Sequence, residues 1–286
     1  MRRAGSWLLA LCLGVALSPT GAAAQNSRLK AIAASKTIKI AYRTDAVPFS
    51  FIDGSKGVAG YTIDVCKAVV ASLERQLKIQ TLKIEWIAVT TQTRFDAVAK
   101  GQADLECGAS TVTLARMKEI DFSNYIFVES TGLAVGASAD VNTLKDLAGK
   151  KIAVIEGTSN EKVMAAKNRE MQLNATLVPV KDRDEAVAAL ESKRVDAFAS
   201  DKLLLYGAQF KDPQALRALS DDLSIEPYAI VLPKGDGELR LAVNTALAEI
   251  FRSGDIEKIF GQWFGTLGLR PGSLLNAVYL LGAIAE

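Results

Sequence analysis

Two stretches of the chain share one order of residue types. Residues 100–108 read KGQADLECG and residues 192–200 read SKRVDAFAS. Each has a helix end, a tight turn, an aspartate and a short buried strand, and strands alternate with helices around both. This alternation is typical of parallel sheets whose faces are covered by crossover helices. The repeat therefore predicts an α/β fold built from two βαβαβ units.

Two long extended segments separate these units. Residues 125–135 can leave one unit and enter the next, and residues 225–232 form a strand that returns. We expect lobe 1 to comprise residues 25–130 and 233–286, and lobe 2 to comprise residues 131–232. Each lobe should hold a mostly parallel sheet flanked by helices. Two crossings between lobes form a hinge, with a cleft for a small ligand between them.

The first 24 residues have the features of a signal peptide. Arg2 and Arg3 precede an apolar run at 7–17, and small residues at 22–24 offer a cleavage site before Gln25. We therefore expect export to the periplasm. The later apolar runs are too short to span a bilayer.

The composition argues against several classes of function. Among 286 residues there is no histidine, which is the commonest general base and metal ligand. Only two cysteines follow the predicted leader, too few for a closed metal site, so neither a metal nor a cofactor is expected. The net charge is +2, and removing the two leader arginines brings it to 0. A neutral surface argues against nucleic acid and anionic membranes as partners.

Residues 104–123 carry the first candidate site. They predict a short buried strand, a turn of small and hydroxyl residues, and a helical turn that includes Arg116. Ligand groups of α/β sheets gather at the carboxyl ends of strands. We expect Arg116 to bind a carboxylate through two hydrogen bonds, with Ser110 and Thr111 beside it. The alternative is a solvated helix arginine whose neighbouring hydroxyls only cap backbone groups.

Two more arginines follow predicted strands. Arg43 comes after the strand at 37–42, at the mouth of a turn-rich loop. Arg94 stands on the first turn of a helix that opens after a polar run containing Thr91. A cation there opposes the helix dipole, so an anionic ligand explains Arg94 better than helix stability does. The alternative for both arginines is pairing with surface acids.

The second unit offers polar groups of its own. A buried strand leads to Thr158 and Ser159 at the start of a predicted helix, which is either an anion site or a plain N-cap. After a helix predicted at 185–192, the strand at 195–199 delivers Asp201.

The cysteines after the leader belong to one lobe. Cys66 lies on a helix predicted at 61–76, and Cys107 ends a strand. A disulfide between helix and sheet is open to them if their Cα atoms lie within about 7 Å. We predict this bridge for an oxidising compartment; two free thiols are the alternative.

Four motifs resemble those of the periplasmic solute-binding proteins for polar amino acids, the receptors of ABC importers known as family 3. They are GYTIDV at 60–65, VPFSF at 47–51, TQTR at 91–94, and ECG at 106–108 leading to Arg116. The last three are most similar to the glutamate/aspartate-binding subgroup. The resemblance implies a type II periplasmic binding protein. Such a protein is a monomeric receptor that captures an acidic amino acid and delivers it to a membrane permease.

The resemblance also implies roles at the α-carboxylate end of the ligand. Arg116 would bind the carboxylate, with Thr111 and Ser110 beside it. Thr158 and Ser159 would close on the same carboxylate from lobe 2.

At the other end, Asp201 would pair with the ligand ammonium, and Arg43 and Arg94 would face its side chain. Thr91 belongs to the same set. Relatives that bind basic amino acids carry a stacking aromatic residue where this chain has Ala46, and a small residue suits a short acidic side chain. Independently of any resemblance, three arginines and one aspartate around one cleft make it positive, as an anionic ligand requires.

Other functions stay open at this point. The ligand is glutamate, aspartate, glutamine or asparagine in the receptor interpretation. Periplasmic cyclohexadienyl or arogenate dehydratases use a similar fold, but need a carboxylic acid that donates a proton. A signalling ectodomain would act only through a partner, because no later segment predicts a membrane span.

Overall fold

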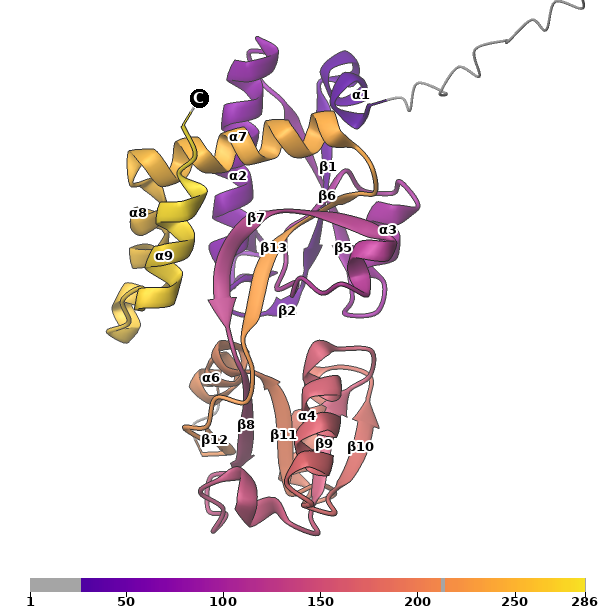
Figure 1. Cartoon of the computed structure of the whole chain (residues 1–286), viewed down its shortest axis with the longest axis vertical. Helices are drawn as coiled ribbons and strands as arrows, with labels where there is room; N and C mark the ends of the chain where they lie inside the picture. Colours follow the sequence, from indigo (N-terminus) through magenta and orange to yellow (C-terminus); the bar gives the residue numbers. More distant parts are fainter. Residues whose placement is uncertain (1–26, 212–213, 286) are drawn as a thin grey trace, which may run out of the picture.

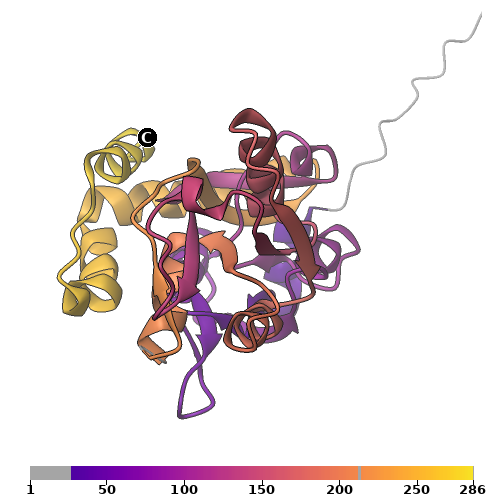
Figure 2. The ribbon, with the colours of Figure 1, turned by 90° about the horizontal axis from the view of Figure 1, so that it is seen from below.

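The computed structural model describes residues 27–211 and 214–285, so the predicted signal peptide at 1–24 lies outside the described residues. The chain folds into two lobes, each built around a five-stranded sheet (Figure 1). Seen along the long axis, the C-terminal helices lie to one side of the molecule (Figure 2). Within the described ranges no helix is both long and apolar enough to cross a membrane.

The sheet of lobe 1 has the strand order β5-β1-β6-β13-β7. Its strands are β1 (Thr37–Arg43), β5 (Lys83–Val89), β6 (Leu105–Glu106), β7 (Ile120–Glu129) and β13 (Glu226–Pro233). β1 pairs in parallel with β5 and β6, whereas β13 is antiparallel to both β6 and β7. Only this strand is therefore reversed, which agrees with the predicted mostly parallel sheet. Its residues 226–232 lie in the sheet of lobe 1, although the expected boundary assigned them to lobe 2.

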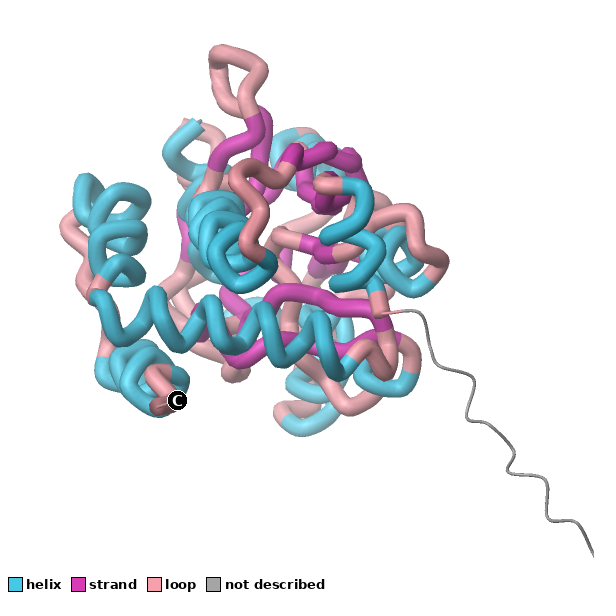
Figure 3. The backbone as a smooth tube through the Cα atoms, turned by 90° about the horizontal axis from the view of Figure 1, so that it is seen from above, coloured by secondary structure: helices cyan, strands magenta, loops and turns pink. Residues whose placement is uncertain are grey.

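Helices cover both faces of this sheet. They are α1 (Arg28–Ser35), α2 (Tyr61–Leu77), α3 (Arg94–Ala99), α7 (Gly237–Ser253), α8 (Asp255–Phe264) and α9 (Ser273–Gly282), with the 3-10 turns η1 (Arg116–Lys118) and η3 (Gly265–Leu267). Seen from above, α7 lies across the lobe, and the C-terminus lies beside one end of it (Figure 3). The core centres on Phe49, whose ring centroid lies 4.9 Å from that of Phe127 and 5.2 Å from that of Tyr228.

The turn-rich loop after β1 contains a small antiparallel sheet. Its strands are β2 (Asp45–Ala46), β3 (Ser50–Ile52) and β4 (Val58–Ala59). The Ser50 hydroxyl accepts a hydrogen bond from the Arg43 backbone N–H at 2.9 Å and donates one to the Arg43 carbonyl at 3.2 Å. These bonds hold the loop against the end of β1, beside the cleft.

The sheet of lobe 2 has the order β10-β9-β11-β8-β12. Its strands are β8 (Thr131–Gly136), β9 (Lys151–Ile155), β10 (Thr176–Val180), β11 (Ala197–Asp201) and β12 (Leu216–Ala218). Its helices are α4 (Ser159–Glu170), α5 (Arg183–Glu191) and α6 (Lys202–Lys211), with the 3-10 turn η2 (Leu144–Leu147). β8 is antiparallel to both its neighbours, so each sheet has one reversed strand next to the crossing. The sequence patterns indicated neither α6 nor β12.

Two chain segments connect the lobes side by side. One passes from β7 through Ser130 into β8, so the extended segment expected at 125–135 is two strands with a break. The other enters β13, where Glu226 pairs with Glu129. Between them, Thr131 donates its N–H to the Ser224 hydroxyl at 3.0 Å, and its carbonyl accepts from the Leu223 N–H at 2.9 Å. These hydrogen bonds join the two crossings to each other.

Cys66 of α2 and Cys107, directly after β6, form a disulfide with their Cα atoms 6.4 Å apart. The bridge ties the helix to the strand that leads into the candidate site.

Candidate functional site

A polar cavity of about 20 Å³ lies between the lobes. Eight of the nine predicted ligand-binding residues line it: Arg43, Thr91, Arg94, Thr111, Arg116, Thr158, Ser159 and Asp201. The ninth, Ser110, is fully buried and accepts a hydrogen bond from Nε of Arg94 at 3.1 Å. Residues far apart in the chain thus meet in one small space, and Ser110 orients one of them.

Arg94 and Arg116 form the lobe 1 side of the cavity. Arg94 begins α3 and donates from Nη1 to the Thr91 carbonyl, and Arg116 donates from Nη1 to the Thr111 carbonyl at 2.7 Å. The Phe95 ring contacts both guanidinium carbons, at 4.2 and 4.7 Å from its centroid. Burial, together with the charges of Arg43 and Arg116, lowers the pKa of Arg94 to about 9, so this side chain stays charged at neutral pH.

A buried carboxylate, Glu106, lies beneath these arginines. Burial raises its pKa, while the charge of Arg94 and the hydroxyl of Ser110 oppose that shift. A Cβ atom at Gly108 would lie 2.2 Å from Oε1 of Glu106 and 3.1 Å from Cγ of Arg43. A side chain at this position would therefore shift the Glu106 carboxylate away from its place beneath the arginines.

Lobe 2 contributes the start of α4. Thr158 is its N-cap: the hydroxyl accepts from the Glu161 N–H at 3.2 Å and donates to the Ile155 carbonyl at 2.7 Å. The plain N-cap alternative thus describes what this hydroxyl does. The Ser159 hydroxyl instead donates to the Thr111 hydroxyl at 3.3 Å, a direct contact between the lobes.

Asp201, the last residue of β11, belongs to a group of buried acids beside the hinge. Burial and the nearby Glu226 raise the pKa of Asp201 to about 6, while Tyr228 and Arg183 oppose that shift. Burial also raises the pKa of Glu129 to about 8, despite hydrogen bonds to its carboxylate from backbone N–H groups. Such acids favour a cationic group that enters beside them.

Arg183 is a fourth arginine that lines the cavity, and it was not among the predicted site residues. The helix predicted from residue 185 begins two residues earlier, because Asp182 is its N-cap and accepts from the Glu185 N–H at 2.8 Å. Arg183 therefore stands on the first turn of a helix that follows a strand. Like Arg94, Arg183 is a cation at the positive end of a helix dipole, and the signal for it in the sequence is the N-cap at Asp182.

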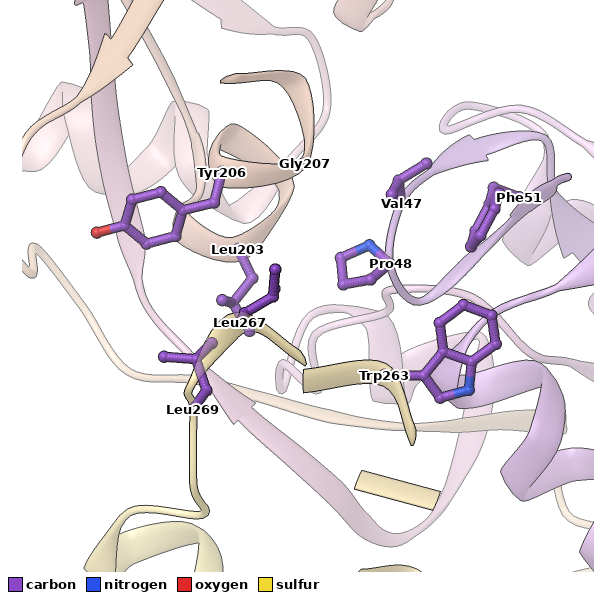
Figure 4. A pocket seen from close by; sticks show the side chains of 9 residues that line it. All are labelled: Val47, Pro48, Phe51, Leu203, Tyr206, Gly207, Trp263, Leu267 and Leu269. Atoms are coloured by element: carbon purple, nitrogen blue, oxygen red, sulfur yellow. The ribbon is translucent and has the colours of Figure 1, made fainter. Parts of the chain in front are cut away.

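A larger pocket of about 550 Å³ lies elsewhere between the lobes and is apolar. Val47, Pro48, Phe51 and Trp263 line it from lobe 1 and Leu203, Tyr206 and Gly207 from α6 (Figure 4). The Tyr206 hydroxyl points away from the other side chains, and the Trp263 indole N–H donates to Asp64 at 2.9 Å. None of the described residues that line this pocket is charged, so none can pair with a carboxylate or an ammonium, and the small polar cavity is the candidate site.

Comparison with known proteins identifies the family of the chain. Residues 38–266 match the family model described as bacterial extracellular solute-binding proteins, family 3. The chain belongs to this family. The resemblance inferred from the sequence motifs is therefore confirmed.

Two curated relatives cover most of this solute-binding protein. A glutamate/aspartate import solute-binding protein of Escherichia coli is 32% identical over 268 residues, which are 92% of this chain and 89% of the relative. An L-glutamate/L-aspartate-binding protein of Pseudomonas aeruginosa is 33% identical over the same shares of the two chains.

Solved structures agree on the two-lobed fold. An ancestral arginine-binding protein bound to arginine superposes with a TM-score of 0.72 at 27% identity, covering 80% of this chain and 98% of that one. An ancestral amino-acid-binding protein described as a precursor of cyclohexadienyl dehydratase has a TM-score of 0.70 at 27% identity, covering 83% and 99%. The predicted α/β fold of a type II periplasmic binding protein is therefore confirmed.

Proposed function

We propose that this solute-binding protein captures glutamate or aspartate between its lobes. It acts in the periplasm, as a monomer, and delivers the amino acid to the permease of an ABC importer. The relatives named for these two amino acids support the proposal. The observation that carries it is the charge of the polar cavity.

Four guanidiniums line the cavity, and they belong to Arg43, Arg94, Arg116 and Arg183. Among the described residues that line it, the one acid is Asp201. Asp45, Glu106 and Glu226 lie behind this lining and act on the same arginines. The lining itself therefore carries an excess of positive charge, which the second carboxylate of an acidic amino acid reduces and the side chain of glutamine does not.

The proposed contacts follow the arrangement of these groups. Arg116 and Thr111 bind the α-carboxylate from lobe 1, and Ser159 and the N-terminus of α4 bind it from lobe 2. Asp201 accepts the ammonium. Arg43 and Arg94 face the ligand side chain.

Binding requires the lobes to separate and close again. The cavity of about 20 Å³ has room for about one water molecule and not for an amino acid. Contacts between the lobes border it, such as Ser159 with Thr111, and Gln92 with the Lys181 carbonyl at 2.7 Å. The ligand therefore enters an open form, and the hinge then brings both lobes onto it.

Calorimetric titration with the common amino acids tests the proposal. Glutamate and aspartate should bind more tightly than glutamine, asparagine and arginine. Preference for a neutral or basic amino acid would overturn the charge argument. Light scattering on the same sample tests whether the protein is a monomer.

A dehydratase is the second candidate, because buried Asp201 and Glu129 have the raised pKa values that a general acid needs. In our proposal Asp201 is occupied by the ligand ammonium. Incubation with prephenate should therefore give no product, and turnover at an enzymatic rate would favour the dehydratase.

A further inference from the structure

The Asp45 carboxylate lies between two of the arginines that line the cavity. Nη2 of Arg43 lies 2.6 Å from its Oδ1, and Nη1 of Arg183 lies 3.3 Å from its Oδ2. Arg183 also donates to the Asp45 carbonyl at 3.1 Å. The two arginine side chains are 5% and 9% exposed and Asp45 is 27% exposed, so the network is largely shielded from water.

We propose that Asp45 is a specificity-determining residue, which acts through Arg43 and Arg183 to set how strongly the site prefers an acidic side chain over its neutral amide. The proposal rests on the proposed function, because it concerns the end of the cavity that faces the ligand side chain. Asp45 itself does not line the cavity.

The single negative charge of Asp45 balances only one of the two guanidinium charges, and its two oxygens cannot accept hydrogen bonds from all of their N–H groups. Within the described part of the chain, Nε of Arg43 and Nε of Arg183 are buried without a hydrogen-bond partner. These donors suit a second carboxylate, which the ligand side chain would supply. Asp45 repels that carboxylate while it neutralises part of the charge that attracts it. It thus holds the preference for an acid below what the two arginines alone would produce.

Asp45 is ionised under all ordinary conditions. Although burial raises its pKa, the charges of Arg43 and Arg183 outweigh burial and lower it below the usual value. The network also joins the lobes, since Asp45 belongs to the loop after β1 and Arg183 to α5. Weakening this link changes the closure of the lobes for every ligand alike, so the effect cancels in a ratio of two affinities.

The test is the ratio of glutamate to glutamine affinity, measured by calorimetry at one pH and salt concentration. Asp45→Asn should raise this ratio by roughly 10- to 100-fold, the range expected for one charge about 6 to 12 Å away at an effective dielectric constant of about 20. Arg183→Gln should lower it by a similar factor. The double variant removes one charge of each sign and should return the ratio to near the wild-type value. Asp184→Asn is the matched control, because Asp184 is exposed beside Arg183, and it should leave the ratio unchanged.

An unchanged or lower ratio in Asp45→Asn would overturn the proposal. If Asp45→Asn alone does not fold, the affinity ratio of the double variant is compared with that of Arg183→Gln. An equally lowered ratio in both variants would show that Asp45 has no role in specificity. If wild-type protein binds neither amino acid, the proposed function fails first, which is a distinct result.

Discussion

Gly207 of α6 allows the two lobes to approach each other. Replacing it with alanine should hinder closure of the lobes without lowering the stability of the fold. The glycine packs against the loop after β1. A Cβ atom on Gly207 would lie 2.6 Å from the Val47 carbonyl oxygen and 3.3 Å from its carbon. Contacts below 3.0 Å essentially do not occur for real Cβ atoms, and the obstacle here is backbone. The lobes of Gly207→Ala therefore cannot close fully without displacing α6 or the loop.

The two expected effects have opposite signs. Overpacking typically costs about 1 to 3 kcal/mol, so amino-acid affinity should fall by roughly 5- to 150-fold if the closed form is the one that binds. Glycine within a helix is less favourable than alanine by about 0.8 to 1 kcal/mol. In the open form the clash with Val47 is absent, while α6 still gains the helix stability that alanine provides. The free energy of unfolding without ligand should therefore stay constant or rise while affinity falls.

Gly261→Ala is the matched control. Gly261 lies within α8, and a Cβ atom there would meet nothing within 4 Å. It should gain helix stability and keep wild-type affinity. Chemical denaturation gives the stability, calorimetry gives the affinity, and small-angle scattering with saturating ligand gives the radius of gyration.

Gly207→Ala should keep a larger radius of gyration than wild type at saturating ligand. Wild-type affinity and wild-type compaction in this variant would refute the reasoning. The ligand would then bind without the approach of α6 to Val47.

Four further variants test the site and the scaffold. Arg116→Ala should lose about 2 to 5 kcal/mol of binding free energy in calorimetry, because it leaves a buried ligand carboxylate unpaired, and near-normal affinity would exclude its assigned role. Arg94→Ala should weaken glutamate more than glutamine, and equal losses would place Arg94 away from the ligand side chain. Between pH 5 and 8 folded Glu129, with a pKa of about 8, binds a proton that the unfolded chain releases near 4.5. The unfolding free energy should thus fall as pH rises, and Glu129→Gln should flatten this slope in denaturation curves. Replacing both Cys66 and Cys107 with serine, which opens a bridge with a sequence separation of 41, should cost about 2 to 4 kcal/mol of unfolding free energy, and an unchanged denaturation midpoint would contradict this.

Local patterns accounted for most of the secondary structure. The apolar spacing of α2 and α7, the buried strand β9 and the hydroxyl residues before α4 act over a few residues, where hydrogen-bonding and burial preferences are strong. The prediction weakened where an element depends on distant contacts. β6 has only two residues, and its strand conformation depends on pairing with β1 and β13.

The sequence by itself determined which polar groups stand after strands and at helix starts. It therefore identified eight of the residues that line the cavity. It also determined the sign of the charge there, because arginine has no neutral form at ordinary pH.

Only the tertiary structure decided which charges share one space. Asp45 and Arg183 are 138 positions apart, and no local pattern relates them, yet the closed lobes bring them together beside Arg43. The effect of Glu106 on the site is not readable from the sequence for the same reason, because it comes from burial beneath arginines of other elements. Electrostatic interactions depend on distance and on exclusion of water, and both are set by how the lobes pack.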